Sequence, residues 1–165
     1  MSCDGLPDAY LEARLAGALE SDLRWQDAAL TCDGMRRPDG LGLRVTFKGQ
    51  VAGSTLTLVF AAPRLAEGES AHAVPVNVTL IVADGAIYGT RGEGKCLLDE
   101  VRQTPLPAAG NGDRRWRVDA RGFCLEPARA VNSTSGAILL SRFDFRGLLS
   151  WEPDPPPPPA PAKAP

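Results

Sequence analysis

The sequence lacks most of the patterns by which catalysis, redox chemistry or membrane insertion is usually recognised. Its 165 residues include one histidine, and only 6% are aromatic. No serine lies in a GxSxG motif, no two cysteines have a CxxC spacing, and no run of about 18 apolar residues occurs. These absences argue against an α/β-hydrolase nucleophile, a zinc ribbon, a thioredoxin-like redox site and a transmembrane helix.

An excess of charge of one sign is also missing. Eighteen Lys and Arg residues stand against 20 Asp and Glu residues, which gives a net charge of −2. Nucleic-acid-binding proteins usually carry a clear basic excess. The densest basic stretch is Arg114–Arg117 with Arg121, and its alternation places the Trp116 ring on the face opposite to Arg115 and Arg117. We therefore expect a solvated surface of mixed charge and no nucleic-acid partner.

Candidate catalytic and metal-binding groups are scattered. His72 lies two residues from Ser70, but closeness in sequence is not triad geometry. Any sequence with 20 acidic residues contains paired carboxylates, which here are Glu67 with Glu69 and Asp99 with Glu100. The dipeptides Asp33-Gly34 and Asp39-Gly40 are interpreted as turns, because the spaced oxygen ligands of a calcium loop are missing. The sequence thus predicts no enzyme, no metal site and no cofactor.

Four cysteines, Cys3, Cys32, Cys96 and Cys124, are the most informative residues present. An even number with wide spacing favours two disulfides over a metal site. Of the three possible pairings we favour Cys3–Cys32 and Cys96–Cys124, because each joins segments that lie close in sequence. Disulfides persist in oxidising compartments, so this pattern predicts an exported protein. The alternative is four buried free thiols in a cytosolic protein.

The hydrophobic pattern predicts one helix followed by strands. Residues 7–20 read as a helix, because Pro7 and Asp8 suit its first turn and apolar residues recur at helical spacing after them. Apolar and polar residues then alternate with a period of two over residues 43–48, 55–60, 76–82, 115–124 and 142–151. Another strand is predicted to begin near Leu23 and to end near Cys32, and Asp84-Gly85 predicts a tight turn.

Seven or eight short strands at such spacing indicate a mainly β fold, a single antiparallel β-sandwich or barrel-like domain over residues 1–151. The N-terminal helix is expected to cover an open edge of the sheet. Residues 152–165 are proline-rich and can form neither helix nor sheet, so we expect a disordered, extended tail.

Charged residues in exposed loops and on strand faces are the candidates for contact with a partner. Two loops stand out as able to insert into another protein, residues 36–40 and the glycine-rich residues 89–94. The candidate partner-binding residues are Arg36, Arg37, Asp39, Arg91, Glu93, Arg115 and Arg117.

Several phrases resemble an uncharacterised family of small exported proteins and lipoproteins of Gram-negative bacteria. They are Leu23-x-Trp25 leading to Cys32-x-Gly34-Met35, then residues 37–40, 77–81 and Cys96, and the closing residues 145–151. This resemblance covers about residues 20–151 and implies export with no assigned activity. In a bacterial lipoprotein an N-terminal cysteine is acylated, so Cys3 could alternatively carry a lipid anchor instead of a disulfide.

Together these patterns predict a periplasmic, outer-membrane-attached or secreted β domain. We expect a non-catalytic binding or structural role in the cell envelope, through a protein partner. The alternative is an inhibitor of a hydrolase, such as a lysozyme or a protease, built on a disulfide-stabilised scaffold.

Overall fold

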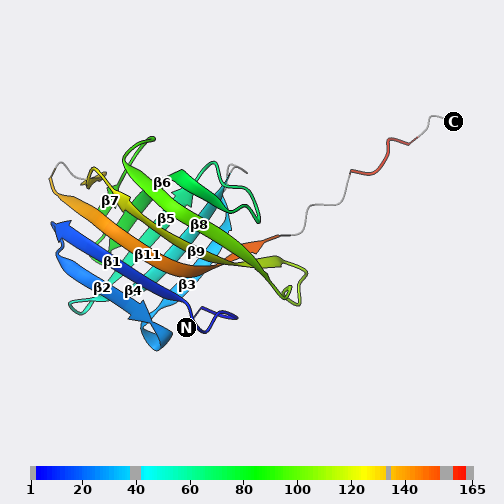
Figure 1. Ribbon diagram of the computed structural model, residues 1–165, viewed down its shortest axis with the longest axis horizontal. Helices are drawn as coiled ribbons and strands as arrows, with labels where there is room; N and C mark the ends of the chain where they lie inside the picture. The colour runs from blue at the N-terminus through cyan, green and yellow to red at the C-terminus, as the bar shows by residue number, and fades with distance from the viewer. Residues whose placement is uncertain (1–2, 38–41, 133–134, 153–157, 163–165) are drawn as a thin grey trace.

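The chain folds into strands joined by turns (Figure 1). The computed structural model describes residues 3–37, 42–132, 135–152 and 158–162. Its described part contains one short 3₁₀ turn, Asp27–Ala29, and no helix that is long and apolar enough to cross a membrane. The strands are β1 (Tyr10–Gly17), β2 (Ser21–Gln26), β3 (Thr31–Arg36), β4 (Leu43–Val51), β5 (Ser54–Ala62), β6 (Ala71–Val82), β7 (Ile87–Gly89), β8 (Cys96–Leu106), β9 (Arg114–Cys124), β10 (Ala128–Ala130) and β11 (Ala137–Trp151).

The strands form a sheet that closes on itself. Strand β6 pairs with β5 on one edge and with β8 on the other, and the path continues through β4, β3, β11 and β9 back to β8. All pairings are antiparallel except that of β3 with β11, where Met35 lies opposite Ser150. Strands β1 and β2 extend the sheet from β11 (Figure 1). The predicted mainly β, antiparallel fold is confirmed, and a sandwich or barrel fits this arrangement.

Alternating side chains fill the interior. Four phenylalanines from β4, β5 and β11 contact one another there, with ring centroids 4.8–6.5 Å apart. These rings are at most 2% exposed, and each buries a large apolar area on folding. They are Phe47, Phe60, Phe143 and Phe145. The predicted strands at residues 43–48, 55–60 and 76–82 lie within β4, β5 and β6, and the predicted turn at Asp84-Gly85 is present.

Two β-bulges, one in β8 and one in β11, shift the alternation of buried and exposed residues by one position partway along each strand. The register skips Asp99 in β8 and Ser141 in β11, and both residues are exposed. Each bulge inserts one residue without a partner, which bends the strand. Gly122 of β9 lies between them, opposite Leu98 on one side and Phe143 on the other. The closed sheet therefore turns a corner at this glycine.

The predicted N-terminal helix over residues 7–20 is wrong. Residues 10–17 form β1, in which Leu11, Ala13 and Leu15 are buried while Glu12 and Arg14 are exposed. Helix-forming residue types dominate the segment, but pairing with both β2 and β11 outweighs their weak intrinsic preference. No helix therefore covers a sheet edge in the described residues.

The single strand predicted from Leu23 to Cys32 is two strands, β2 and β3, separated by the 3₁₀ turn. The dipeptide Asp33-Gly34 is also not a turn, because it lies within β3. A Cβ atom on Gly34 would overlap the backbone carbonyl of Leu148. Glycine serves here to let β11 pass close to β3.

Two disulfides tie the sheet together, Cys3–Cys32 and Cys96–Cys124. These are the pairings favoured from the sequence. The second joins directly opposed residues of β8 and β9, and the first attaches the N-terminal segment to β3. Because disulfides are reduced in the cytosol of most organisms, the pair indicates a non-cytoplasmic protein.

The proline-rich tail lies largely outside the described residues. Residues 158–162 are exposed and belong to no strand. The predicted extended conformation of the whole segment 152–165 stays a prediction.

Candidate functional site

The outer surface of β2, β1, β11, β9 and β8 carries two parallel rows of polar side chains. The strand registers place these residues directly opposite one another, and most of their sequence neighbours point into the core. The first row is Arg24, Glu12, Asp144, Arg121 and Glu100, and the second is Gln26, Tyr10, Arg146, Asp119 and Arg102. We call these ten residues, together with Arg117 on β9, the charged face.

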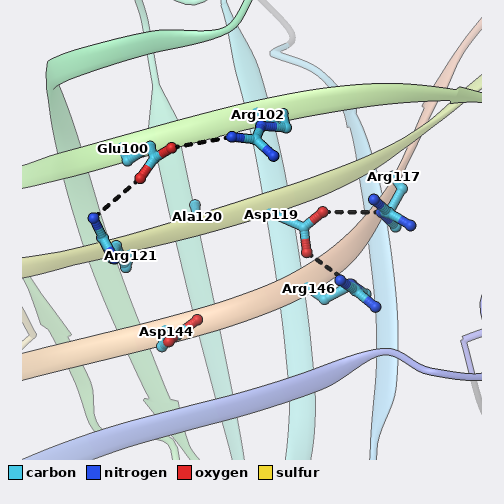
Figure 2. Close-up of a pocket in the computed structure, with 8 residues that line it drawn as sticks. All are labelled: Glu100, Arg102, Arg117, Asp119, Ala120, Arg121, Asp144 and Arg146. Carbon is cyan, nitrogen blue, oxygen red and sulfur yellow. Dashed lines mark hydrogen bonds and ion pairs between the residues drawn. The ribbon is translucent and has the colours of Figure 1, made fainter.

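Asp119 organises the centre of the charged face. Its carboxylate accepts a hydrogen bond from Nε of Arg117 at 2.9 Å and one from Nε of Arg146 at 2.6 Å (Figure 2). The three side chains are 25–32% exposed, so water screens them only in part. Charge-assisted bonds of this kind are short and fix geometry. The centre is therefore a rigid arrangement of two guanidinium groups around one carboxylate.

Glu100 organises the neighbouring part in the same way. Its two carboxylate oxygens lie 3.1 Å from Arg121 and 3.4 Å from Arg102 (Figure 2). Both arginine side chains are about two-thirds exposed. Exposed pairs contribute little to stability, so these two guanidinium groups remain accessible to another molecule.

A second set of contacts connects the charged face to the N-terminal segment. Arg146 donates to Asp8, and the Tyr10 hydroxyl donates to Asp144 at 2.8 Å. Burial, followed by this hydrogen bond, raises the pKa of Tyr10 to about 12. The hydrogen bond to Asp119 is the largest cause of the raised pKa of Arg146. Tyr10 is thus a neutral hydrogen-bond donor at physiological pH.

The charged face is hollowed but not enclosed. A shallow groove of about 360 Å³ runs over β8, β9 and β11, between Glu100 and Arg146. Two further hollows, of about 450 and 270 Å³, adjoin it, and Asp144 lines all three. Small-molecule sites are usually concave and mostly apolar. This surface is broad, charged and open instead.

The groove is poorly suited to catalysis. Its lining among the described residues consists of four arginines, three carboxylates and Ala120. Arginine is not deprotonated in proteins, Asp119 and Glu100 are held by guanidinium groups, and Asp144 accepts a hydrogen bond from the Tyr10 hydroxyl. The arrangement can recognise complementary charges, and each of the three carboxylates in the lining is already engaged by a donor.

Of the enzyme candidates from the sequence, only Glu100 belongs to the charged face. Glu67 accepts hydrogen bonds from Arg114 at 2.7 and 2.8 Å and from the Trp116 indole at 2.9 Å, and these contacts lower its pKa. The Ser70 hydroxyl accepts the Gln103 N–H at 3.3 Å. His72 is exposed on β6, opposite Glu100. Within the described ranges, no group of three His, Cys, Asp or Glu residues could hold a metal ion.

The structure disperses the predicted partner-binding residues. Arg36 ends β3 with its guanidinium 5.4 Å from the centre of the Trp151 ring, and Arg37 follows it. The loop before β8 contains Glu93 and the exposed Arg91, and Glu93 forms an ion pair with Arg64, which follows β5. Asp39 lies outside the described residues.

Only the two β9 residues of the predicted set reach the region of the charged face. Arg117 belongs to it, and Arg115, two residues away on the same strand, donates to the carbonyl of Asp4 at 2.8 Å. The other members were missed, although their alternation with apolar residues was visible in the sequence. The missing signal is strand order, which brings the five strands side by side.

Compared with models of known protein families, curated proteins and solved structures, the chain has no match. The resemblance to small exported proteins of Gram-negative bacteria therefore stays a prediction.

Proposed function

We propose that this chain is a non-catalytic, exported binding domain that docks a protein partner on the charged face. The observation that carries the proposal is the pair of charged rows across five strands, with exposed arginines held in place by carboxylates. Arginine is enriched at protein interfaces, and preorganised side chains lose less entropy on binding. An acidic or mixed-charge protein surface would meet complementary charges there.

The proposed location is the periplasm, the outer membrane or the extracellular space. The two disulfides support export, and a role in the bacterial cell envelope follows from the resemblance noted in the sequence. Cys3 is in a disulfide, so a lipid anchor on this residue would require its sulfur to exchange that bond for a thioether. We propose the unlipidated form.

The test uses charge reversal at the exposed arginines. The double variant R102E/R121E changes two guanidinium groups that are about two-thirds exposed and leaves Asp119, Arg117 and Arg146 intact. A control, K48E, reverses a single exposed charge on β4, which lies outside the charged face. Each protein is immobilised and exposed to the envelope and secreted fractions of the native host.

We expect the wild type and K48E to retain the same partner. For R102E/R121E we expect binding weakened about tenfold or more, and wild-type binding should weaken with added salt. Unchanged binding of the same partner by R102E/R121E would contradict the charged face as the docking surface.

The inhibitor alternative rests on a different feature, the loop at residues 89–94. Its tip is exposed, while the buried Thr90 anchors its base by donating its N–H to the Val78 carbonyl at 3.0 Å. The ion pair between Arg64 and Glu93 holds its far side. An anchored, protruding loop on a disulfide-stabilised scaffold suits insertion into an active site.

A panel of lysozymes and proteases would test this alternative. It predicts inhibition of at least one enzyme at micromolar protein and loss of inhibition in R91E. The second loop considered, at residues 36–40, lies mostly outside the described residues. No inhibition at micromolar excess would exclude the inhibitor role for the enzymes tested.

A further inference from the structure

Strand β2 is a free edge of the sheet in the described part of the chain. It pairs with β1 on one side, and among the described residues no strand pairs with its other side. Figure 1 shows β2 as the outermost strand beside β1. An edge strand presents backbone donors and acceptors that another strand can use.

The sequence of β2 is self-complementary in an antiparallel arrangement. Asp22 and Arg24 flank Leu23, and both point outward while Leu23 is buried. When two copies pair antiparallel about Leu23, Asp22 of each copy lies opposite Arg24 of the other. Opposite charges placed directly across from each other stabilise such a pair. Charges of one sign on an edge would repel a second copy of it, whereas Asp22 and Arg24 have opposite signs.

The rest of the strand fits the same register. On the core side, Trp25 of one copy would lie opposite Ser21 of the other, a large side chain beside a small one, and the two Leu23 residues would face each other. The first row of the charged face ends at Arg24, next to Glu12. In the pair, this row would continue onto Asp22 of the second copy, so that Arg24 has an acidic residue on each side, Glu12 of its own chain and Asp22 of the other.

Both charges are accessible for this contact. The Asp22 side chain is 69% exposed and lies 3.2 Å from Arg14 within the chain. A carboxylate has lone pairs for more than one donor, so it can accept Arg24 of the other copy in addition. Arg24 is exposed.

We propose that the chain forms a symmetric dimer by antiparallel pairing of two β2 strands about Leu23. The contact is isologous, meaning that the same patch serves on both copies. It joins the two charged faces into one continuous surface. The proposal does not depend on which partner, if any, that surface binds.

Sedimentation velocity of the full chain, from low micromolar to several hundred micromolar, tests the dimer. We expect the wild type to approach twice the 17.5 kDa mass of one chain as concentration rises. The variants D22R and R24E each replace two attractions per dimer with two repulsions. Each alone should raise the dimer Kd about tenfold or more.

An equimolar mixture of D22R and R24E gives the decisive readout. In a mixed pair, the arginine introduced by D22R faces the glutamate introduced by R24E, while the unchanged Arg24 of the first chain faces the unchanged Asp22 of the second. Dimers should therefore return as mixed pairs. A general folding defect would not be repaired by mixing. If a reversal fails to fold, the neutral variants D22N and R24Q replace it, and each should still weaken the dimer.

Three results would overturn the proposal. The wild type could be a monomer at every concentration, both single variants could dimerise as well as the wild type, or the mixture could stay monomeric. With the neutral variants, an unchanged dimer Kd would have the same meaning.

Discussion

Glu67 illustrates how one side chain can hold a loop in place. It lies in the segment between β5 and β6 and accepts both guanidinium bonds of Arg114, together with the Trp116 indole N–H. Gly68, the next residue, packs against the Trp116 ring. The sequence showed Glu67 only as one of two carboxylates close together, with Glu69, and its contacts explain it as a structural residue.

The variant Glu67→Gln should lower the free energy of unfolding by about 1–2 kcal/mol at neutral pH, because it loses the charge in a partly exposed ion pair. The pKa of Glu67 is lowered, so its stabilisation is present above the usual carboxyl pKa and lost as pH falls through the folded value. Urea unfolding between pH 7 and pH 3 measures this.

The wild type should therefore lose more stability on acidification than Glu67→Gln does. Glu152→Gln, at an exposed position after β11, serves as the matched control and should behave like the wild type. Identical acid dependence in the wild type and Glu67→Gln would contradict the assigned role.

Tyr10 supports a prediction at alkaline pH. Its pKa is raised from 10.0 to about 12, chiefly by burial and then by the hydrogen bond to Asp144. Its contribution to stability is therefore complete below pH 10 and is lost as pH rises through about 12. In a titration followed by phenolate absorbance, Tyr10→Phe should lack the late step that the wild type shows. An unchanged late step would contradict this environment for Tyr10.

At the scale of elements, the strands with strict alternation could be predicted from the sequence, and the N-terminal strand could not. In β1, Leu11 and Leu15 satisfy a helical spacing of four as well as a period of two through Ala13. Helix-forming residue types then favoured the wrong choice. The pairing partner that decides the matter, β11, lies more than 120 residues away.

The charged face could not be predicted from the sequence for the same reason, because it depends on contacts between distant segments. Alternation revealed that Arg142, Asp144 and Arg146 share a face of their strand, and that Asp119 and Arg121 share a face of theirs. Which strands adjoin depends on side-chain packing between distant segments, and two bulges change the face partway along. The sequence therefore predicted charged strands but not a charged site.

A substitution at Gly122 tests the corner of the sheet between the two bulges. A Cβ atom there would overlap the Leu97 carbonyl oxygen and lie 2.8 Å from the Phe143 ring. Gly122→Ala should cost about 1–3 kcal/mol in unfolding free energy, as overpacked sites do. Gly110→Ala is the control, because a Cβ atom there meets nothing within 4 Å. Equal stability of the two variants would show that the corner can relax without cost.

At the scale of the whole molecule, the disulfides limit how far the unfolded chain can expand. The Cys96–Cys124 bridge has a sequence separation of 28 residues. In the chain-entropy model, replacing both cysteines by serine should cost about 3–4 kcal/mol of stability. Urea unfolding of Cys96→Ser/Cys124→Ser against the oxidised wild type measures the loss. A loss below about 1 kcal/mol would mean that the bridge adds little beyond the strand pairing of β8 with β9.

The most direct test of the account is the intact mass of the protein from its native host, alkylated before and after reduction. A disulfide-stapled, exported domain predicts no alkylation before reduction, four alkylated cysteines after it, and no lipid mass on Cys3. Alkylation of all four thiols without reduction would place the protein in a reducing compartment and contradict the assignment.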